Sequence, residues 1–383
     1  MAISASDTPK QPPGFMEGAT CLPARSYTSR EQFDREIECC FRTGWISIAT
    51  TQQLLSPGEI LPVNAAGEPL IITRDSKNQV HVFYNICRHR GLKLVDGELP
   101  QKCSGLLSCP YHSWGYALDG RLMATPYFDS NKDSFPDNTI KEKSGLLPIR
   151  FAVWADIIFV NLSGKAQPFE EFIAPLQQRW HHFDLSLLRL AYSNRYTVSS
   201  NWKLACENFL DTYHVPWVHS RLGGPDEMFS GLEFTYLSDD IFGFIKPDFD
   251  RGRDQAEFVP TLFPGIETRF EYALDLVFIF PNTLLMITPS WLQLISLAPQ
   301  GPALTHELLA GYLVGDAMMS DSLEEYRAGF AELLNEINTQ DVVILEKLQA
   351  GRKTAAADHG QYAPYWDQLS ERLAQRILRA VKA

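Results

Sequence analysis

Four potential metal ligands in two short loops constrain the fold of this 383-residue chain more than any other feature. The first loop, CRH, holds Cys87 and His89, and the second, CPYH, holds Cys109 and His112, with residues 90–108 between them. Each loop offers a thiolate and an imidazole, and two sulfide-bridged irons need four protein ligands, two of which can be histidines on one iron. Two cysteines and two histidines also suit tetrahedral zinc, although zinc sites usually pair like residues along the chain. The spacing predicts that the loops fold together around a metal centre, rather than serving as unrelated core cysteines and surface histidines.

Alternating apolar residues on either side of these loops predict a β-rich domain. Residues 80–86 alternate after a polar turn, 114–118 alternate into the hairpin signal Asp119-Gly120, and 151–161 have the pattern of one further strand. The turn-forming residues after 161 mark a domain boundary. We therefore expect three segments: a tail and helix over 1–44 that packs on the catalytic domain, a cluster domain over 45–165 and a second, catalytic domain over 166–383.

The rest of the chain mixes helical and strand patterns. Residues 202–213 and 321–349 have helical spacing, whereas 269–280 and 291–297 read as strands. A further helix is predicted to begin at a capping box at Ser29. This order favours an α+β fold, with an antiparallel sheet flanked by helices, over a βαβ repeat.

A second group of potential ligands lies at the predicted helix 202–213. Glu207, Asp211 and His214 have the i, i+4, i+7 spacing of one helical face. Pro216 cannot continue the helix, so His219 can return toward the same point from another element. Two imidazoles and a carboxylate on one face of an iron leave positions open for dioxygen and substrate. The alternative is that both histidines are ordinary, partly buried side chains.

The predicted C-terminal helix offers the missing carboxylate. Asp341 lies in the middle of an apolar stripe, where a carboxylate is costly unless a cation meets it. A metal is the economical partner, and a salt bridge to an arginine is the alternative. Glu336 and Glu346 are weaker candidates because the stripe flanks them less symmetrically. The stripe consists of Phe330, Leu334, Ile337, Ile344, Leu345 and Leu348.

These motifs resemble a known family. The runs CRHRG and CPYHSW, followed by a hairpin, are similar to the Rieske [2Fe-2S] domain of Rieske non-haem iron oxygenases, the α subunits of ring-hydroxylating and related oxygenases. The later segment resembles the family's D-x2-H-x4-H iron motif, with NWK and ENF before it and a D-x4-E-x2-Q segment in the late helix. The resemblance spans about residues 25–350. It implies Cys87, His89, Cys109 and His112 as ligands of a [2Fe-2S] cluster, and His214, His219 and Asp341 as ligands of a mononuclear Fe(II).

The resemblance also implies a reaction and partners. Electrons pass from the cluster to the mononuclear iron, where O2 is activated for mono- or dioxygenation of a bound substrate. Asp211 matches a family carboxylate that hydrogen-bonds the first iron histidine and a cluster histidine of the neighbouring subunit, here His112, in a head-to-tail homotrimer. Asn208 matches an asparagine near the iron. The chain has no flavin or nicotinamide fingerprint, so we expect a separate reductase, with or without a ferredoxin, and a β subunit is compatible with the resemblance.

Composition limits the other functions. A net charge of −12 argues against nonspecific binding of nucleic acid or an anionic membrane. A redox donor would need a local basic patch, for which Arg88, Arg90 and Lys93 are candidates. The longest apolar runs fall far short of the roughly 20 residues of a spanning helix, and the N-terminal residues have no signal-peptide pattern. We therefore expect a cytoplasmic protein.

The identity of the substrate is the least constrained prediction. Asp211 and Val215 stand where family members that oxidise quaternary ammonium compounds tend to carry glutamate and cysteine, which favours an aromatic or other small organic substrate. Hydroxylation or oxidative demethylation of a quaternary ammonium compound is the alternative. A Rieske electron carrier without oxygenase activity and a zinc-binding interaction protein are the rivals of other classes. The pocket should be built from residues 230–300 and the final helices. Six aromatic residues there are candidates for its apolar walls, although most of them are expected in the core: Phe242, Phe244, Phe270, Phe278, Phe280 and Trp291.

Overall fold

The structure is a computed structural model that describes residues 21–54, 56–129, 132, 137–250 and 258–382. It divides into two compact units: a smaller unit, Arg42–Ala166, and a larger unit that combines the residues up to Phe41 with Gln167–Ala383. Among the described residues, no helix combines the length and apolar character needed to cross a membrane.

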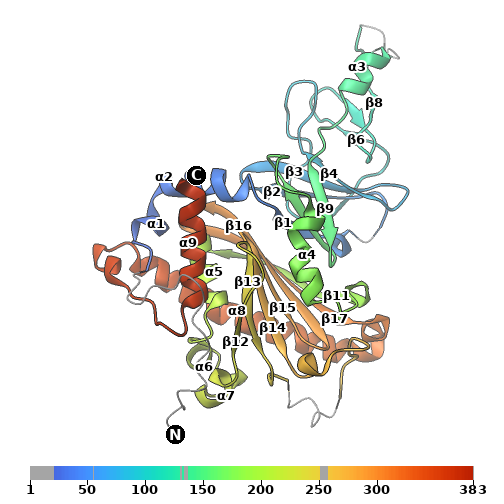
Figure 1. Cartoon of the computed structure of the whole chain (residues 1–383). Helices are drawn as coiled ribbons and strands as arrows, with labels where there is room; N and C mark the ends of the chain where they lie inside the picture. Colours follow the sequence, from blue (N-terminus) through green and yellow to red (C-terminus); the bar gives the residue numbers. More distant parts are fainter. Residues whose placement is uncertain (1–20, 55, 130–131, 133–136, 251–257, 383) are drawn as a thin grey trace. The chain divides into compact units, whose positions relative to one another are not determined.

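The described residues of the smaller unit form three small antiparallel sheets (Figure 1). The predicted strand 151–161 is wrong, because this segment forms two paired strands. Between the two strands, Ala155 and Asp156 have positive φ angles of 51° and 70°, as expected of a two-residue hairpin turn. The sheets contain β1 (Ile46–Thr50), β10 (Ile157–Asn161) and β9 (Arg150–Trp154); β4 (Val80–Tyr84), β3 (Glu68–Arg74), β2 (Glu59–Ala65) and β5 (Gln101–Lys102); and β6 (Leu107–Ser108), β7 (Gly115–Tyr116) and β8 (Leu122–Ala124), with α3 at Asn138–Lys143.

The predicted hairpin at Asp119-Gly120 is confirmed, since β7 pairs with β8 across it. Gly120 has a φ of 87°, and a Cβ there would lie 2.5 Å from a ring carbon of Phe83. Only glycine therefore combines this turn with such close packing. Phe83 belongs to the apolar core that also contains Cys87 and Cys109, so the hairpin and both ligand loops share one core.

The larger unit is built on one seven-stranded antiparallel sheet, ordered β11-β17-β16-β15-β14-β13-β12 (Figure 1). Every residue of β13 and β14 is buried, so these strands meet solvent on neither face. Helix α5 contacts α8, α9 and β16, and α8 contacts β11. The expected antiparallel α+β arrangement is confirmed. The strands are β11 (Leu188–Val198), β12 (Glu233–Tyr236), β13 (Ile241–Lys246), β14 (Leu274–Ile279), β15 (Thr283–Ile287), β16 (Trp291–Gly301) and β17 (Leu304–Val314); the helices are α1 (Arg25–Thr28), α2 (Arg30–Glu36), α4 (Phe169–Arg179), α5 (Trp202–Leu210), α6 (Val215–Val218), α7 (Pro225–Phe229), α8 (Glu324–Gly351) and α9 (Gln368–Lys382).

One predicted strand boundary in this unit is wrong. The predicted strand 269–280 begins only at Leu274, after a 3-10 turn over Thr268–Phe270.

The helix start predicted at Ser29 is confirmed, because Ser29 caps α2 by accepting from the Gln32 N–H at 3.2 Å. The Gln32 side chain donates to Glu36 at 3.0 Å, a bond within α2.

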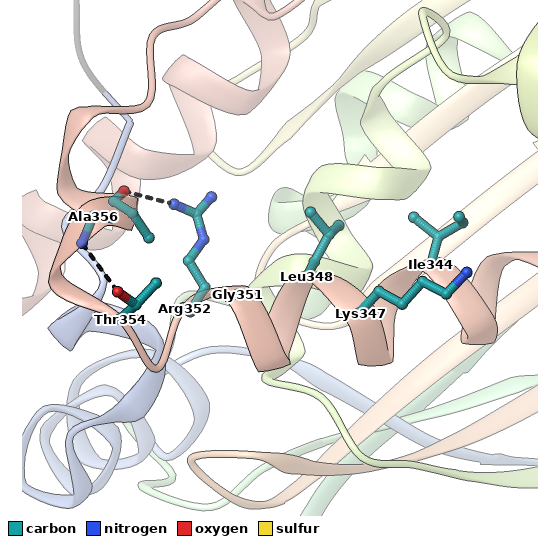
Figure 2. Close-up of a pocket in the computed structure, with 8 residues that line it drawn as sticks. Ile344, Lys347, Leu348, Gly351, Arg352, Thr354 and Ala356 are labelled. Atoms are coloured by element: carbon teal, nitrogen blue, oxygen red, sulfur yellow. Dashed lines mark hydrogen bonds between the residues drawn. The ribbon is translucent and has the colours of Figure 1, made fainter.

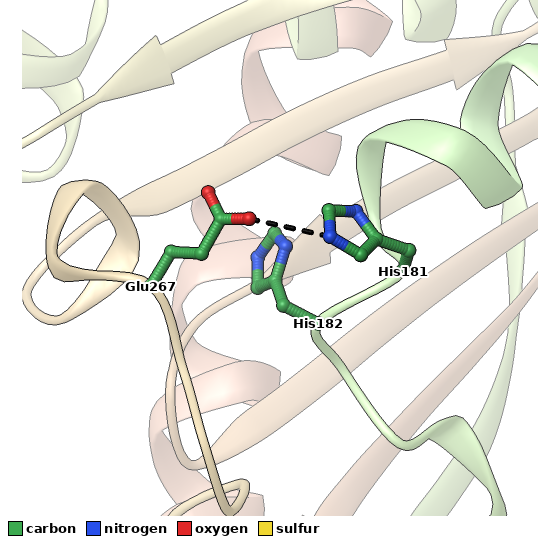
Figure 3. A group of neighbouring side chains, drawn as sticks. All are labelled: His181, His182 and Glu267. Carbon is green, nitrogen blue, oxygen red and sulfur yellow. Dashed lines mark ion pairs between the residues drawn. The ribbon is translucent and has the colours of Figure 1, made fainter.

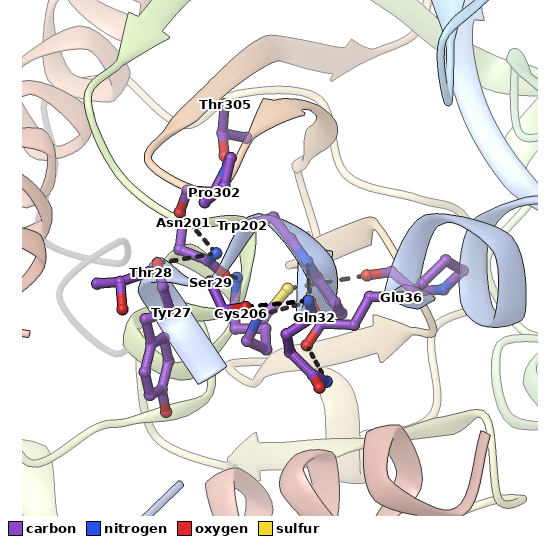
Figure 4. A network of polar contacts seen from close by, with 12 residues as sticks. Tyr27, Thr28, Ser29, Gln32, Glu36, Asn201, Trp202, Cys206, Pro302 and Thr305 are labelled. Atoms are coloured by element: carbon purple, nitrogen blue, oxygen red, sulfur yellow. Dashed lines mark hydrogen bonds and ion pairs between the residues drawn. The ribbon is translucent and has the colours of Figure 1, made fainter. Parts of the chain in front are cut away.

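A buried polar network joins α2 to α5 (Figure 4). The side chains of Glu36 and Lys203 are both fully buried, and their charged atoms lie 2.6 Å apart. The Trp202 indole N–H donates to the same carboxylate at 3.1 Å. The charges are therefore compensated where no water can reach them, and this network fixes the helix that precedes the smaller unit onto the larger unit.

Replacement of Lys203 should destabilise the larger unit strongly. Lys203→Met leaves Glu36 buried without its cation, so we expect the free energy of unfolding to fall by about 3–5 kcal/mol. Arg30→Met is the control, because the Arg30–Asp34 pair on α2 is exposed and such pairs contribute less than about 1 kcal/mol. Urea unfolding followed by tryptophan fluorescence measures both variants. Equal losses in the two would contradict the assigned role of the buried pair.

Candidate metal centres

The two ligand loops of the smaller unit have the same backbone hydrogen bonds. In each loop the cysteine carbonyl accepts from the residue four positions later, Gly91 at 3.0 Å and Ser113 at 2.9 Å. In each, the cysteine N–H donates to the carbonyl five positions later at 2.8 Å. Gly91 and Ser113 both have positive φ, 76° and 56°. Cys87 and Cys109 therefore open two equivalent tight turns, although their histidines follow at different spacings.

The structure brings the four predicted residues of these loops together in an asymmetric way. Cys87 and Cys109 are each 2% exposed, whereas His89 and His112 lie at the surface. The two imidazole centroids are 4.7 Å apart. Trp114 stacks on His89 at 4.8 Å with an interplanar angle of 8° and restrains that ring. Buried thiols with exposed imidazoles suit a cluster whose cysteine-bound iron lies inside and whose histidine-bound iron faces outward.

A tyrosine that the sequence analysis did not single out contacts the first thiol. The Tyr116 hydroxyl accepts from the Arg88 N–H at 3.0 Å and lies 3.3 Å from Cys87 Sγ. Because its acceptor side is engaged, the hydroxyl hydrogen is free to point at the sulfur. Hydrogen bonds to ligand sulfurs are one of the ways in which a protein sets a cluster's reduction potential.

The second predicted group also comes together, within the larger unit. One ligand atom each from His214, His219 and Asp341 lies within 4.8 Å of the others. Asp341 Oδ1 is 3.0 Å from His219 Nε2 and 3.5 Å from His214 Nε2. His214 and His219 flank the short helix α6, and Asp341 projects from α8. Two imidazoles that face one carboxylate oxygen fit the two-histidine, one-carboxylate set of non-haem iron.

The single helical face predicted for Glu207, Asp211 and His214 is wrong. Helix α5 ends at Leu210, and Asp211 is extended, with φ −96° and ψ 115°. The Asp211 carboxylate accepts from the Tyr213 N–H at 2.6 Å, a local turn that competes with the helix. His214 therefore reaches the site from outside α5.

Glu207 points elsewhere than the predicted face. Its carboxylate accepts from the Tyr27 hydroxyl at 2.5 Å. Burial raises the pKa of Glu207 to about 7, against the opposing effects of Tyr27, Arg352 and Lys203.

Each histidine of this group is oriented through its other ring nitrogen. His214 Nδ1 is 3.3 Å from Asp211 Oδ2, and His219 Nδ1 is 2.7 Å from Gln340 Oε1. Acceptors at Nδ1 select the tautomer that turns the Nε2 lone pair toward Asp341. Gln340 was not predicted from the sequence, in which its only signal is its position next to Asp341.

The electrostatics of the site favour positive charge. Burial by itself would lower the pKa of His214, but hydrogen bonds to Asp211 and Asp341 raise it to about 9. Asn208 Nδ2 is 3.2 Å from Asp341 Oδ1 and 3.3 Å from His214 Nε2, so this amide adjoins two of the three side chains. A group of side chains that holds a proton this strongly also suits a metal cation.

The weaker carboxylate candidates on α8 have other partners. Glu336 pairs with Arg221 at 2.7 Å, and Glu346 accepts from the Ser199 N–H at 3.1 Å. Glu307 on β17 was not predicted as a residue near the site. It is only 4% exposed, and burial raises its pKa to about 7.

A cavity of about 390 Å³ adjoins the histidines and Asp341. Of the six aromatic candidates for its walls, Phe244 and Trp291 line it, and the other four are buried in the core, as expected for most of them. Its volume suits a small organic molecule. Besides Asn208, Asp211, His214, His219 and Asp341, its lining includes the apolar residues Leu222, Met228, Phe249, Leu274, Leu276, Met286, Phe330 and Leu334 and the polar residues Thr212, Arg221, Lys246, Asp250 and Gln293.

Another hollow, of about 490 Å³, lies at the C-terminal end of α8 (Figure 2). It is lined by Ile344, Lys347, Leu348 and Arg352, among others, and it contains none of the predicted ligands. Leu348, expected in the apolar stripe, is 41% exposed, whereas the neighbouring Gln349 is 2% exposed, so Leu348 lies off the buried face of α8.

An iron–sulfur centre that supplies single electrons, together with an iron that keeps open positions beside an apolar cavity, provides what O2-dependent oxidation of an organic molecule requires. This combination defines the class of Rieske non-haem iron oxygenases.

Comparison with family models agrees with this class. Residues 44–140 match the Rieske [2Fe-2S] domain, and residues 185–383 match the ring-hydroxylating alpha subunit (catalytic domain). The chain belongs to this family, and the resemblance inferred from its motifs is confirmed. It is an oxidoreductase, the oxygenase component that carries a Rieske [2Fe-2S] cluster and a mononuclear iron and uses O2 with electrons from a partner reductase.

Curated relatives match over most of the chain. Choline monooxygenase of Amaranthus tricolor is 26% identical over 351 residues, which are 89% of this chain and 73% of that protein. The carnitine monooxygenase oxygenase subunit of Escherichia coli K12 is 25% identical over 349 residues, 88% of this chain and 85% of that protein.

Solved structures share the fold. A quaternary ammonium Rieske monooxygenase in complex with L-carnitine superposes with a TM-score of 0.73 at 21% identity, covering 95% of each chain. Naphthalene 1,2-dioxygenase from Rhodococcus gives 0.76 at 17% identity, covering 94% of each chain.

Proposed function

We propose that the two metal centres are assembled by the residues predicted from the sequence. The observation that carries the catalytic assignment is that Asp341 Oδ1 faces Nε2 of both His214 and His219. Segment 45–165 then holds the cluster and segment 166–383 the catalytic iron. Of the predicted segment 1–44, residues 1–20 lie outside the described residues, and the helical residues up to Phe41 belong to the larger unit. The cluster ligands are Cys87, His89, Cys109 and His112, and the iron ligands are His214, His219 and Asp341.

When bound, the mononuclear iron supplies O2 activation next to the substrate, using electrons delivered through the cluster. Asp211 and Gln340 hold the two imidazoles by their Nδ1 atoms and keep Nε2 available. Asn208 fixes Asp341 by its amide N–H. The apolar cavity walls limit the access of water to the reacting carbon.

We propose a small quaternary ammonium compound as the substrate, hydroxylated or oxidatively demethylated. The relatives named above oxidise choline and carnitine, and their similarity covers 88–89% of this chain. Trp291 and Phe330 both line the cavity, with ring centroids 6.2 Å apart. Aromatic faces bind quaternary ammonium groups through cation–π attraction.

Hydroxylation of an aromatic substrate is the second candidate. It is favoured by the predominantly apolar cavity lining and by Asp211 and Val215, which differ from the glutamate and cysteine typical of the ammonium-oxidising members. A panel of betaines, choline-like alcohols and aromatic acids, incubated with the reconstituted enzyme and a reductase, separates the candidates. Coupled O2 consumption and product formation with the ammonium compounds alone would support the first candidate, and coupling with the aromatic acids alone would exclude it.

Trp291→Leu should raise KM for the ammonium substrate about tenfold or more, because a desolvated cation–π contact contributes about 2 kcal/mol. The neutral tert-butyl isostere of the same substrate is the control and should lose much less. Trp291→Phe should recover most of the ammonium affinity. Equal losses for the charged and neutral molecules would show that Trp291 contributes only shape. Steady-state kinetics of the wild type and of both variants, with the charged and the neutral molecule, measures these effects.

We further propose a cytoplasmic homotrimer in which Asp211 faces His112 of the partner subunit. Support comes from the Asp211–His214 contact on one side and the exposed His112 imidazole on the other. The electron donor, a reductase with or without a ferredoxin, would dock at the exposed residues Arg88, Arg90 and Lys93 beside the cluster loops. Analytical ultracentrifugation tests the trimer, and a β subunit would increase the mass found.

A further inference from the structure

A third group of potential metal ligands lies outside the cavity (Figure 3). One ligand atom each from His181, His182 and Glu267 lies within 4.8 Å of the others. The two histidines directly follow α4 and its C-cap Trp180, and Glu267 directly precedes the 3-10 turn over Thr268–Phe270. None of the three lines the 390 Å³ cavity.

The geometry of His181 already matches that of a metal ligand. Its Nδ1 lies 2.8 Å from the Gln178 carbonyl, which can only accept, so Nδ1 carries the hydrogen. Its Nε2 lies 3.3 Å from Glu267 Oε1. Two ligand atoms at 2.0–2.2 Å from a tetrahedral zinc ion are about 3.4 Å apart. An imidazole with acceptors at both nitrogens is either protonated or shares Nε2 with a metal ion.

His182 distinguishes these readings. Both of its ring nitrogens are buried, and among the described residues neither has a hydrogen-bond partner. The ring packs against Phe183 and Phe270, with centroids 4.2 Å and 4.0 Å away. A buried imidazole without partners is costly whether charged or neutral. An ion pair between His181 and Glu267 leaves that cost in place, whereas a metal at the centre of the three groups would use one of the His182 nitrogens.

The surrounding charges permit a divalent cation. Glu267 supplies one negative charge, and the nearby Arg179 is neutralised by Asp275, to which it donates at 2.7 Å and 2.8 Å. The Arg269 guanidinium is turned over the Phe270 ring at 4.8 Å.

We propose that His181, His182 and Glu267 form a site for a divalent transition-metal ion of the zinc class. Two imidazoles and one carboxylate make a known zinc ligand set, and water would complete the coordination. The ion would join the end of α4 to the segment that leads into β14, whose residues Leu274 and Leu276 line the cavity. Its role is therefore structural, and distinct from oxygen activation.

Zinc uptake by the full-length, iron-loaded enzyme tests the proposal. After equilibrium dialysis against micromolar Zn²⁺, the wild type should retain about one zinc per chain by elemental analysis. His182→Phe, which preserves the aromatic packing, should retain none. His306→Phe, a histidine on β17 outside the group, is the matched control and should behave as the wild type.

Two further variants keep the outcome unambiguous. Glu267→Gln changes a side chain that is 47% exposed, so it should fold normally while losing zinc. His214→Ala should retain its zinc, which separates this site from the mononuclear iron site. Wild-type enzyme that retains no zinc, or unchanged zinc in both His182→Phe and Glu267→Gln, would overturn the proposal.

Discussion

His214→Ala should remove the mononuclear iron and abolish oxygenation while leaving the iron–sulfur cluster in place. Only two of the three ligands remain, and Asp211 and Asn208 lose the imidazole that they contact. Wild-type enzyme should contain about three irons per chain, two in the cluster and one mononuclear, and the variant about two. Product formation should fall below detection, because the cluster alone has no open position for O2.

Iron analysis, the visible absorption of the cluster and product assays check this result together. His306→Ala is the control, and it should keep all three irons and full activity. Retention of three irons by His214→Ala would refute the assignment of this residue as a ligand. Loss of the cluster absorption as well would indicate a general folding defect, which circular dichroism would reveal.

The cluster loops could be predicted because the residues that define them lie close together in the sequence. Four candidate ligands occupy two runs of three and four residues, and the flanking alternation indicates strands on both sides. The structure brings the His89 and His112 rings to 4.7 Å, as that pattern requires. Asp341 could be proposed as a ligand from the sequence of α8 alone, since an apolar stripe around a carboxylate indicates that a cation meets it.

Elements that depend on competing short-range contacts could not be predicted. The helical spacing that groups Glu207 with His214 is genuine, but the Asp211 carboxylate takes the Tyr213 N–H and ends the helix. Residues 151–161 are apolar apart from Asp156 and Asn161, so no run of polar residues marks the hairpin turn. Periodicity describes which residues are apolar, and it does not indicate which backbone groups a side chain will bind.

Side chains that orient the ligands are hidden for a different reason. Gln340 meets His219 only in the folded chain, because the two residues are 121 positions apart in the sequence. Asn338 on α8 and Glu307 on β17, which do not contact the proposed ligands by hydrogen bonds, form a buried pair of the same long-range kind at 3.4 Å. Such pairs are set by tertiary packing, whereas the ligands themselves are restricted in type by the metal.

Asp211→Ala should leave both metal centres loaded and yet lower product formation by at least about 100-fold. Removal of a carboxylate that orients a metal-bound histidine typically costs 10–100-fold, and the proposed contact with His112 of the partner subunit adds the loss of the electron path. Asp211→Glu keeps the carboxylate and should recover part of the activity. Asp226→Ala, on the exposed first turn of α7, is the control and should have no effect.

The reoxidation of the reduced cluster provides the measurement that separates these roles. With substrate and O2 present, the cluster of the wild type should be reoxidised within a turnover, whereas that of Asp211→Ala should stay reduced in stopped-flow absorption. A carboxylate that only oriented His214 would change the iron's spectroscopic signature without stopping reoxidation of the cluster. Near-normal reoxidation and product yield in Asp211→Ala would therefore remove the bridging role, and it would leave the Asp211 contacts with His214 Nδ1 and the Tyr213 N–H as purely local ones.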